Sequence, residues 1–351
     1  MAKIKIAFLG CGYMGQNAHL SNYVQLDSCE VAGLCDAKKK QAELVAARYG
    51  IPRVYGSEKE LLSDPEVQGV VAAQWFDFHT DTAPKVLEAG KHLLTEKPLC
   101  VYPQNGAKLV EIAAKTGKIH MVANHKRSDP ASEYAVDQIR AWKQSGEVGK
   151  FKYLRVTMPP GDWVAGANKV ISTDEKAGEN VHEARPAGVS DEFHQAMNSF
   201  VNYYIHQINL MRFFLDEDFR LSYTEKSGVL LGVESVSGIP GILEMSPYST
   251  NQEWHEAALA CFEKGFVKVE LPAPLAAQQA GRVTVYRNTP AGEYYTTPVL
   301  PYISAMRNQA ANFIRAINGE KRAPCTSADA VKDLQIAWDY IKAMEPFPKL
   351  G

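Results

Sequence analysis

The sequence predicts an α/β fold in two domains: a doubly wound parallel sheet, then a second α/β domain whose strands are mainly antiparallel. Three observations support this prediction. The chain has 351 residues, more than one compact core of ordinary size contains. Strand-like and helix-like segments alternate as far as Asn124, whereas several later strand-like segments follow one another without helices. We therefore expect a first domain at residues 1–124 and a second at residues 125–351.

In the first domain, short apolar segments are separated by helix-like segments. Gly50, Gly90 and Gly117 each follow such a segment, as glycine commonly does where a helix ends. Strands joined through helices of this length form right-handed crossovers, so the sheet is expected to be parallel with helices on both faces. The predicted strands are residues 3–9, 30–35, 68–73, 92–95 and 119–123, and the predicted helices run from a glycine-rich turn to about 26 and over 38–49, 79–89 and 104–116.

The pattern changes after Asn124. A long loop over residues 159–189 is rich in glycine, proline and acidic residues, and a loop of this length in a folded domain is usually functional or mobile. The two closing helices are candidates to pack back toward the first domain. The remaining predicted elements are a helix over 131–144, a strand over 151–158, a helix over 191–215, short strands between 219 and 287, and helices over 303–317 and 327–344.

Composition and charge exclude several classes of function. The formal net charge is −2, so a broad basic surface for nucleic acid is not expected. The six cysteines form no C-x-x-C pair, which is typical of a reducing compartment rather than a disulfide framework or a zinc ribbon. No leader pattern precedes the first strand, and no apolar run reaches the roughly 20 residues that cross a bilayer. We expect a cytoplasmic protein that binds neither nucleic acid nor membrane.

A glycine-rich turn follows the first predicted strand. Residues 10–15 read Gly-Cys-Gly-Tyr-Met-Gly, which fits G-x-G-x-x-G at the opening of a helix, the context in which this motif binds a dinucleotide pyrophosphate. Asp36 ends the second predicted strand at about the spacing of a carboxylate that binds a ribose 2′-hydroxyl. Its charge favours NAD, whereas the nearby Lys38 and Lys39 keep NADP as the alternative cofactor.

Lys97 follows the fourth predicted strand, at the edge where open α/β sheets bind ligands. Pro98 restricts the residue before it and so directs Lys97 away from the sheet. The ammonium group can stabilise negative charge that develops on a substrate oxygen. The competing interpretation is a surface lysine paired with Glu96, and spacing alone does not separate the two.

Residues 87–99, Leu-Glu-Ala-Gly-Lys-His-Leu-Leu-Thr-Glu-Lys-Pro-Leu, resemble the signature of the glucose–fructose oxidoreductase, inositol dehydrogenase and rhizopine catabolism (Gfo/Idh/MocA) family. The Gly10–Gly15 turn, Asp36 and His79 also match. The resemblance implies a Rossmann domain, a second domain with a large open sheet often used in homo-oligomers (dimers or tetramers), and a catalytic Lys97. Gln74 and Trp75 depart from the Thr-Pro-Asn that is usual there. The cofactor-binding residues expected are Gly10, Gly12, Tyr13, Met14, Gly15, Asp36, Gln74, Trp75, His79, Glu96, Lys97, Pro98 and Asn124.

The predicted helix over 191–215 carries a polar stripe that includes Asn202, His206 and Asn209. A histidine has a pKa near 6.5, suited to accepting a hydroxyl proton, but on such a helix it is more often structural. The family resemblance favours a catalytic His206. It also places Asn202 where an Asp is common, and an amide cannot act as a base.

Other residues are candidate substrate contacts. Trp163 is expected to stack on a sugar ring or to anchor a core, and Arg185 and Asn209 are further candidates. The His182, Glu183, Asp191, His194 and His206 side chains have irregular spacing that matches no zinc motif, so no metal site is predicted.

Three functions remain open. The first is hydride transfer between nicotinamide and a secondary alcohol of a sugar, glycoside or cyclitol, with Lys97 and His206 handling the proton. The second is a glycosidase- or lyase-like reaction that uses a tightly bound NAD as an internal redox cofactor. The third is a non-catalytic ligand sensor on the same fold, against which the presence of Lys97 and His206 counts.

Overall fold

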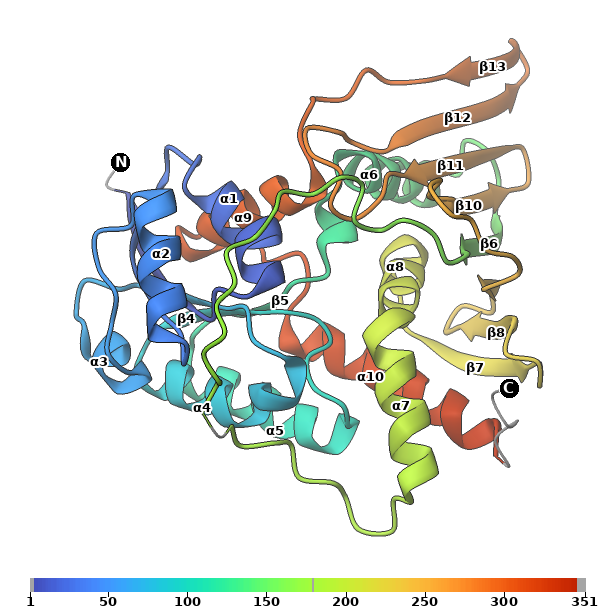
Figure 1. Ribbon diagram of the computed structural model, residues 1–351. Helices are drawn as coiled ribbons and strands as arrows, with labels where there is room; N and C mark the ends of the chain where they lie inside the picture. Colours follow the sequence, from blue (N-terminus) through green and yellow to red (C-terminus); the bar gives the residue numbers. More distant parts are fainter. Residues whose placement is uncertain (1–2, 179, 346–351) are drawn as a thin grey trace. The chain divides into compact units, whose positions relative to one another are not determined.

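The computed structural model describes residues 3–178 and 180–345 of the chain (Figure 1). Its contacts group into two compact units. The first unit contains Met1–Asn124, Ala167–Val189 and Met306–Gln335, and the second contains His125–Gly166, Ser190–Ala305 and Ile336–Gly351. The first unit therefore takes two later segments of the chain in addition to residues 1–124, one from the predicted long loop and one from the closing helices.

The first unit is built on a five-stranded parallel sheet in the order β2-β1-β3-β4-β5. Beyond β2, Val54 adds a single parallel bridge to Leu34. The strand order reverses between β1 and β3, and ligands of open α/β sheets bind at the carboxyl edge beside such a reversal. The strands are β1 Ile4–Leu9, β2 Cys29–Cys35, β3 Gly69–Ala72, β4 His92–Thr95 and β5 His120–Val122.

Helices surround this sheet. The last of them, α9, contributes Phe313 and Ile314 to the same apolar core as Phe8 and Val71. A Cβ added to Gly69 in β3 would lie 3.0 Å from Ile317, so helix and sheet are in close contact there. The helices are the π-helix η1 Gly15–Leu20, α1 Ser21–Tyr23, α2 Lys39–Tyr49, α3 Glu58–Ser63, the 3₁₀ helix η2 Phe76–Phe78, α4 His79–Glu88, α5 Pro103–Thr116 and α9 Ala305–Ile317.

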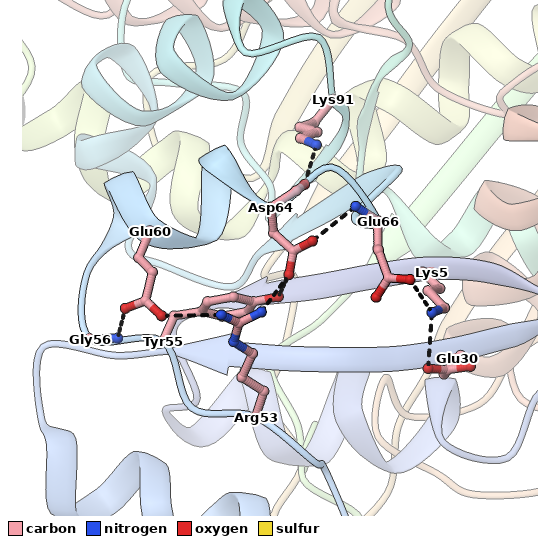
Figure 2. Close-up of polar contacts among 9 residues, drawn as sticks. All are labelled: Lys5, Glu30, Arg53, Tyr55, Gly56, Glu60, Asp64, Glu66 and Lys91. Carbon is pink, nitrogen blue, oxygen red and sulfur yellow. Dashed lines mark hydrogen bonds and ion pairs between the residues drawn. The ribbon is translucent and has the colours of Figure 1, made fainter.

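The short helix α3 was not predicted from the sequence. Ser57 caps it by accepting a hydrogen bond from the Glu60 N–H at 3.1 Å. Figure 2 shows the polar cluster that follows, in which Asp64 accepts from Arg53 at 2.8 Å and from the Tyr55 hydroxyl at 2.9 Å. The pKa of Asp64 is lowered most by the hydrogen bond from the Glu66 backbone N–H, then by the Tyr55 hydroxyl and the Arg53 charge. The cluster attaches α3 to the segment after β2 and is structural.

The second unit contains an eight-stranded sheet in the order β13-β12-β11-β10-β6-β9-β8-β7. Only β6 and β9 pair in parallel among the described strand pairs of this sheet. Both sheets confirm the predicted fold class. The strands are β6 Phe151–Met158, β7 Phe219–Thr224, β8 Leu230–Ser235, β9 Pro240–Met245, β10 Glu256–Phe262, β11 Gly265–Leu271, β12 Arg282–Thr289 and β13 Gly292–Thr296.

Helices α6 and α8 pack on this sheet, α6 on β11 and β12, α8 on β6 and β9. The predicted single helix over 191–215 is wrong in one respect, because the helix is broken at Tyr204 into α7 and α8. The helices of this unit are η3 His125–Ser128, α6 Pro130–Ser145, α7 Asp191–Tyr203 and α8 Ile205–Leu215. Helix α10 Ser327–Ala343 is divided between the units, its residues up to Gln335 belonging to the first and those from Ile336 to the second. In the described part of the chain, no helix has both the length and the apolar composition that a membrane span requires.

Candidate active site

The glycine-rich turn connects β1 to η1. Gly10 has φ +87°, and a Cβ there would lie 2.9 Å from the Ala73 carbonyl oxygen. A Cβ on Gly15 would lie 3.0 Å from the Gly10 oxygen, so both positions require glycine for close packing. A Cβ on Gly12 would meet nothing within 4 Å. The backbone at Gly12 is therefore open to a ligand such as a pyrophosphate.

Asp36 lies beside this turn. Its Oδ2 accepts a hydrogen bond from the Cys11 N–H at 2.7 Å, and its Oδ1 accepts from the Lys38 N–H at 2.8 Å. The first bond joins the end of β2 to the turn after β1. A carboxylate has about four acceptor positions, so Asp36 retains capacity for a ribose hydroxyl.

The helix after the turn contains a π-helical segment, η1 Gly15–Leu20, within the regular helix that the sequence predicts. A π-bulge at the start of a helix often accompanies a functional site. It buries Gln16 and His19, while Tyr13 in the turn is exposed and Met14 is half-buried. Gln16 donates to the Cys11 carbonyl at 2.8 Å and so stabilises the turn from within.

His19 and Glu96 form a buried ion pair, with 2.6 Å between Nε2 and Oε1. Burial is the largest single influence and would raise the pKa of Glu96, but His19 and Lys97 together outweigh it through their charges and hydrogen bonds and lower that pKa. The other carboxylate oxygen accepts the Lys97 backbone N–H at 3.0 Å. The Lys97–Pro98 peptide bond is cis, and the Lys97 side chain is half-buried. Glu96 therefore holds the backbone of Lys97 against η1.

Replacing His19 by phenylalanine should leave the buried Glu96 carboxylate without its partner. We expect the free energy of unfolding to fall by about 2–3 kcal/mol at neutral pH, measured by urea denaturation. Because the lowered Glu96 pKa stabilises the native state only while the group is ionised, the deficit should shrink as the pH falls below the ordinary value of 4.5. His19→Gln, which keeps a donor, should lose less, and equal losses in both variants would contradict this account.

The loop after β3 carries three further predicted cofactor residues. Gln74 accepts a hydrogen bond from the Thr82 hydroxyl at 2.9 Å. Trp75 is 49% exposed beside Phe76, so its indole is available to a ligand. His79 is fully buried and shares a 3.0 Å hydrogen bond with the Leu99 carbonyl, and burial lowers its pKa to about 4. A neutral His79 thus connects the start of α4 to the segment after Pro98.

Asn124 lies two residues after the end of β5 and is buried. Its Nδ2 lies 3.3 Å from the Cys325 sulfur, whereas its Oδ1 is buried without a hydrogen-bond partner within residues 3–178 and 180–345. A buried amide oxygen without a partner is costly unless a ligand satisfies it. Together with the open backbone at Gly12 and the acceptor at Asp36, it makes this edge of the sheet fit a dinucleotide cofactor.

The other predicted residues are divided between the two units. Arg185 belongs to the first unit and is exposed. Its charge acts on Tyr102, whose pKa is nevertheless raised by burial to about 12. In the second unit, Trp163 is 40% exposed and Asn202 is exposed on α7. His206 on α8 is half-buried, and its ring packs edge-on against that of His125 with 5.1 Å between centroids.

Asn209, one of the predicted substrate contacts, is buried within the second unit. It is 1% exposed, and its Oδ1 accepts a hydrogen bond from Arg127 Nε at 2.7 Å. A second bond runs from Arg127 to the Asn209 backbone carbonyl at 3.2 Å. The structure therefore uses Asn209 to hold Arg127 beneath α8.

A buried charge pair near His206 was not predicted. Lys126 donates to Glu256, and both side chains are almost completely buried. Glu256 also accepts from Gln207 at 2.9 Å and from the Trp254 indole at 3.0 Å. The members of this network, Lys126, Gln207, Trp254 and Glu256, come from three separate segments of the chain, so local sequence patterns carry no signal for it.

Glu175 of the long loop and His19 were also missed, and Glu183 was considered only as a possible metal ligand, not as an acceptor for backbone N–H groups. His19 lies on the helix that the glycine motif opens, and that motif is a signal that was available. Among the described residues, no three His, Cys, Asp or Glu side chains form a group that could hold a metal ion.

Comparison with known proteins agrees with this geometry. Residues 4–124 match the model of the oxidoreductase family with an NAD-binding Rossmann fold, GFO_IDH_MocA. Residues 4–124 therefore belong to this family. The resemblance identified from residues 87–99 is thereby confirmed.

Curated Gfo/Idh/MocA relatives include the D-glucoside 3-dehydrogenase of Escherichia coli, 28% identical over 177 residues, which are 48% of this chain and 48% of the relative. Another is the NAD⁺-dependent scyllo-inositol 2-dehydrogenase of Bacillus subtilis, 31% identical over 154 residues, 44% of each chain. These matches span slightly less than half the length of the relatives. A solved structure, a putative NADPH-dependent oxidoreductase of Desulfitobacterium hafniense, shares the fold over 99% of this chain and 96% of its own, with a TM-score of 0.76 and 12% identity.

Proposed function

We propose that this Gfo/Idh/MocA chain is an NAD-dependent dehydrogenase that oxidises a secondary alcohol of a sugar, glycoside or cyclitol. One observation carries the proposal: the carboxyl edge of a single parallel sheet bears both the Gly10–Gly15 turn with Asp36 and the Lys97 whose backbone Glu96 holds. The family membership and the names of the relatives, which include a glucoside and an inositol dehydrogenase, support it.

The residues divide the work as follows. The turn and the start of η1 would bind the pyrophosphate, Asp36 would accept from the ribose, and Gln74, Trp75 and Asn124 would line the same site. Bound NAD supplies a hydride acceptor. The Lys97 ammonium would donate to the substrate hydroxyl and stabilise the negative charge on its oxygen while the hydride leaves carbon.

The hydroxyl proton needs an acceptor. We assign it to His206, with Asn202 orienting the substrate, because an amide donates and accepts hydrogen bonds but takes no proton. Trp163 and Arg185 remain candidates for substrate contact. NAD is preferred to NADP because Asp36 bears a negative charge where the additional phosphate of NADP would lie. We also retain the prediction of a homo-oligomer.

The test is a panel of sugars, glycosides and inositols assayed for NAD⁺ reduction by absorbance. The expected result is turnover of at least one polyol, above the rate of the Lys97→Ala variant under the same conditions. If no polyol reduces the cofactor faster than that variant does, the dehydrogenase proposal fails.

A second function is favoured by one observation, the attachment of residues 167–178 and 180–189 along the edge of the sheet where a cofactor would bind. Ile171 exchanges two hydrogen bonds of 2.8 Å with Gln16, and Glu183 accepts the Val101 and Tyr102 N–H groups. A cofactor held beneath such a segment would exchange slowly, as an internal redox cofactor requires. Bound NAD in the purified protein, with turnover of a glycoside when none is added, would support it over the first.

A further inference from the structure

Two helices of the first unit begin without a capping side chain of their own. The residue before α2 is Lys38 and the residue before α5 is Tyr102, and neither side chain accepts a backbone N–H. We name residues 167–178 and 180–189 the strap, the green segment in Figure 1. The strap supplies the missing cap of α2 through Glu175, and through Glu183 it binds the backbone N–H groups of the two residues just before α5.

Glu175 occupies the N-terminus of α2 with both carboxylate oxygens. Oε1 accepts the Lys40 N–H at 3.0 Å, and Oε2 accepts the Gln41 N–H at 2.9 Å. The Thr173 hydroxyl also donates to Oε2 at 2.8 Å, which fixes the rotamer. The bond from Lys40 lowers the pKa of Glu175, so the group is negatively charged at neutral pH.

Asp36 binds the same short segment. It accepts the Lys38 N–H, and Glu175 accepts the N–H groups of Lys40 and Gln41. Two carboxylates, 139 positions apart in the numbering of the chain, thus lie on the turn that joins β2 to α2. In a Rossmann domain, this turn faces the adenosine ribose.

We propose that Glu175 is a specificity-determining residue that makes the nucleotide site select NAD over NADP. The inference rests on the proposed NAD-dependent function and deepens it. The 2′-phosphate of NADP carries a charge of about −1.5 to −2 near pH 7 and requires free N–H groups or cations. At this turn Glu175 already occupies the N–H groups and opposes the added charge.

The lysines explain why a second carboxylate matters here. Lys38, Lys39 and Lys40 are consecutive on this turn and would otherwise attract a phosphate. Repulsion between two partly solvated charges a few ångströms apart amounts to about a factor of ten in affinity. Glu175 therefore offsets the positive charge of these lysines. The lysines alone would leave NADP as an alternative cofactor, whereas with Glu175 beside them the site favours NAD.

The experiment measures the dissociation constants of NAD⁺ and NADP⁺ by isothermal titration calorimetry of the full chain. The variants are Glu175→Gln, which retains one acceptor for the α2 N–H groups, and Asp174→Asn, which removes the same charge from an exposed neighbour. Glu175→Gln should bind NADP⁺ about tenfold more tightly and NAD⁺ within about threefold of the wild type. Asp174→Asn should change the ratio by less than about twofold. Thermal melting of each variant checks the fold.

Each outcome has a distinct meaning. An unchanged NADP⁺ to NAD⁺ ratio in Glu175→Gln, or an equal change in Asp174→Asn, overturns the assignment of Glu175 while leaving the dehydrogenase proposal intact. A wild-type chain that binds NADP⁺ as tightly as NAD⁺ also overturns it. A wild-type chain that binds neither nucleotide instead refutes the proposed function on which the inference rests.

Discussion

Replacement of Lys126 by alanine is expected to lower the free energy of unfolding by about 3–5 kcal/mol. Lys126 is 4% exposed and neutralises Glu256, which is 2% exposed. Without the ammonium group, the carboxylate keeps only the neutral donors Gln207 and Trp254 and remains charged in a medium that solvates it poorly. Urea denaturation followed by circular dichroism measures the loss.

A double-mutant cycle separates this effect from lost packing. Glu256→Gln should restore part of the stability of the Lys126→Ala variant, because it removes the uncompensated charge, although it destabilises the wild-type chain. An exposed pair on the same unit, Arg220 with Glu234, provides the matched comparison, and Arg220→Ala there should cost less than about 1 kcal/mol. Similar losses at the buried and the exposed pair would contradict the expectation.

Lys97→Met should reduce the kcat of the proposed alcohol oxidation by about 10³-fold while changing the affinity for NAD⁺ by less than about fivefold. Methionine keeps the length of the side chain and removes the charge that stabilises the substrate oxygen. Steady-state kinetics with the best polyol, together with calorimetric titration of NAD⁺, separates the two quantities.

The control is Lys115→Met, which removes one positive charge from an exposed position on α5. It should leave kcat within about twofold of the wild type. A Lys97 variant that loses NAD⁺ binding and kcat in parallel would place this lysine in cofactor binding alone.

Much of the first unit follows from short-range patterns. The Gly10–Gly15 turn, Asp36 and the alternation of strands and helices are each visible within a window of some tens of residues, and the five strands lie within two residues of the predicted bounds. Helix α3 shows a missed local signal, because Ser57 and Glu60 have the spacing of a helix start.

Most contacts that the sequence did not predict join residues that are far apart in the chain. Glu175 with Lys40, Glu183 with Val101 and Lys126 with Glu256 join residues 135, 82 and 130 positions apart, and no periodicity encodes which charges meet. The break at Tyr204 is similar in kind. The apolar pattern continues through it without glycine or proline, so no local helix breaker predicts it.

The discontinuity of the first unit also has a consequence for how the protein is made. Phe313, Ile314 and Ala323 complete the apolar core that begins with Ile4 and Ile6, and the strap caps α2 and binds the backbone just before α5. During synthesis, the N-terminal sheet therefore leaves the ribosome long before the residues that close its core. Until α9, Ala305–Ile317, has been translated, that sheet exposes the apolar surface that this helix later covers, and such exposed surface favours aggregation of an incomplete chain.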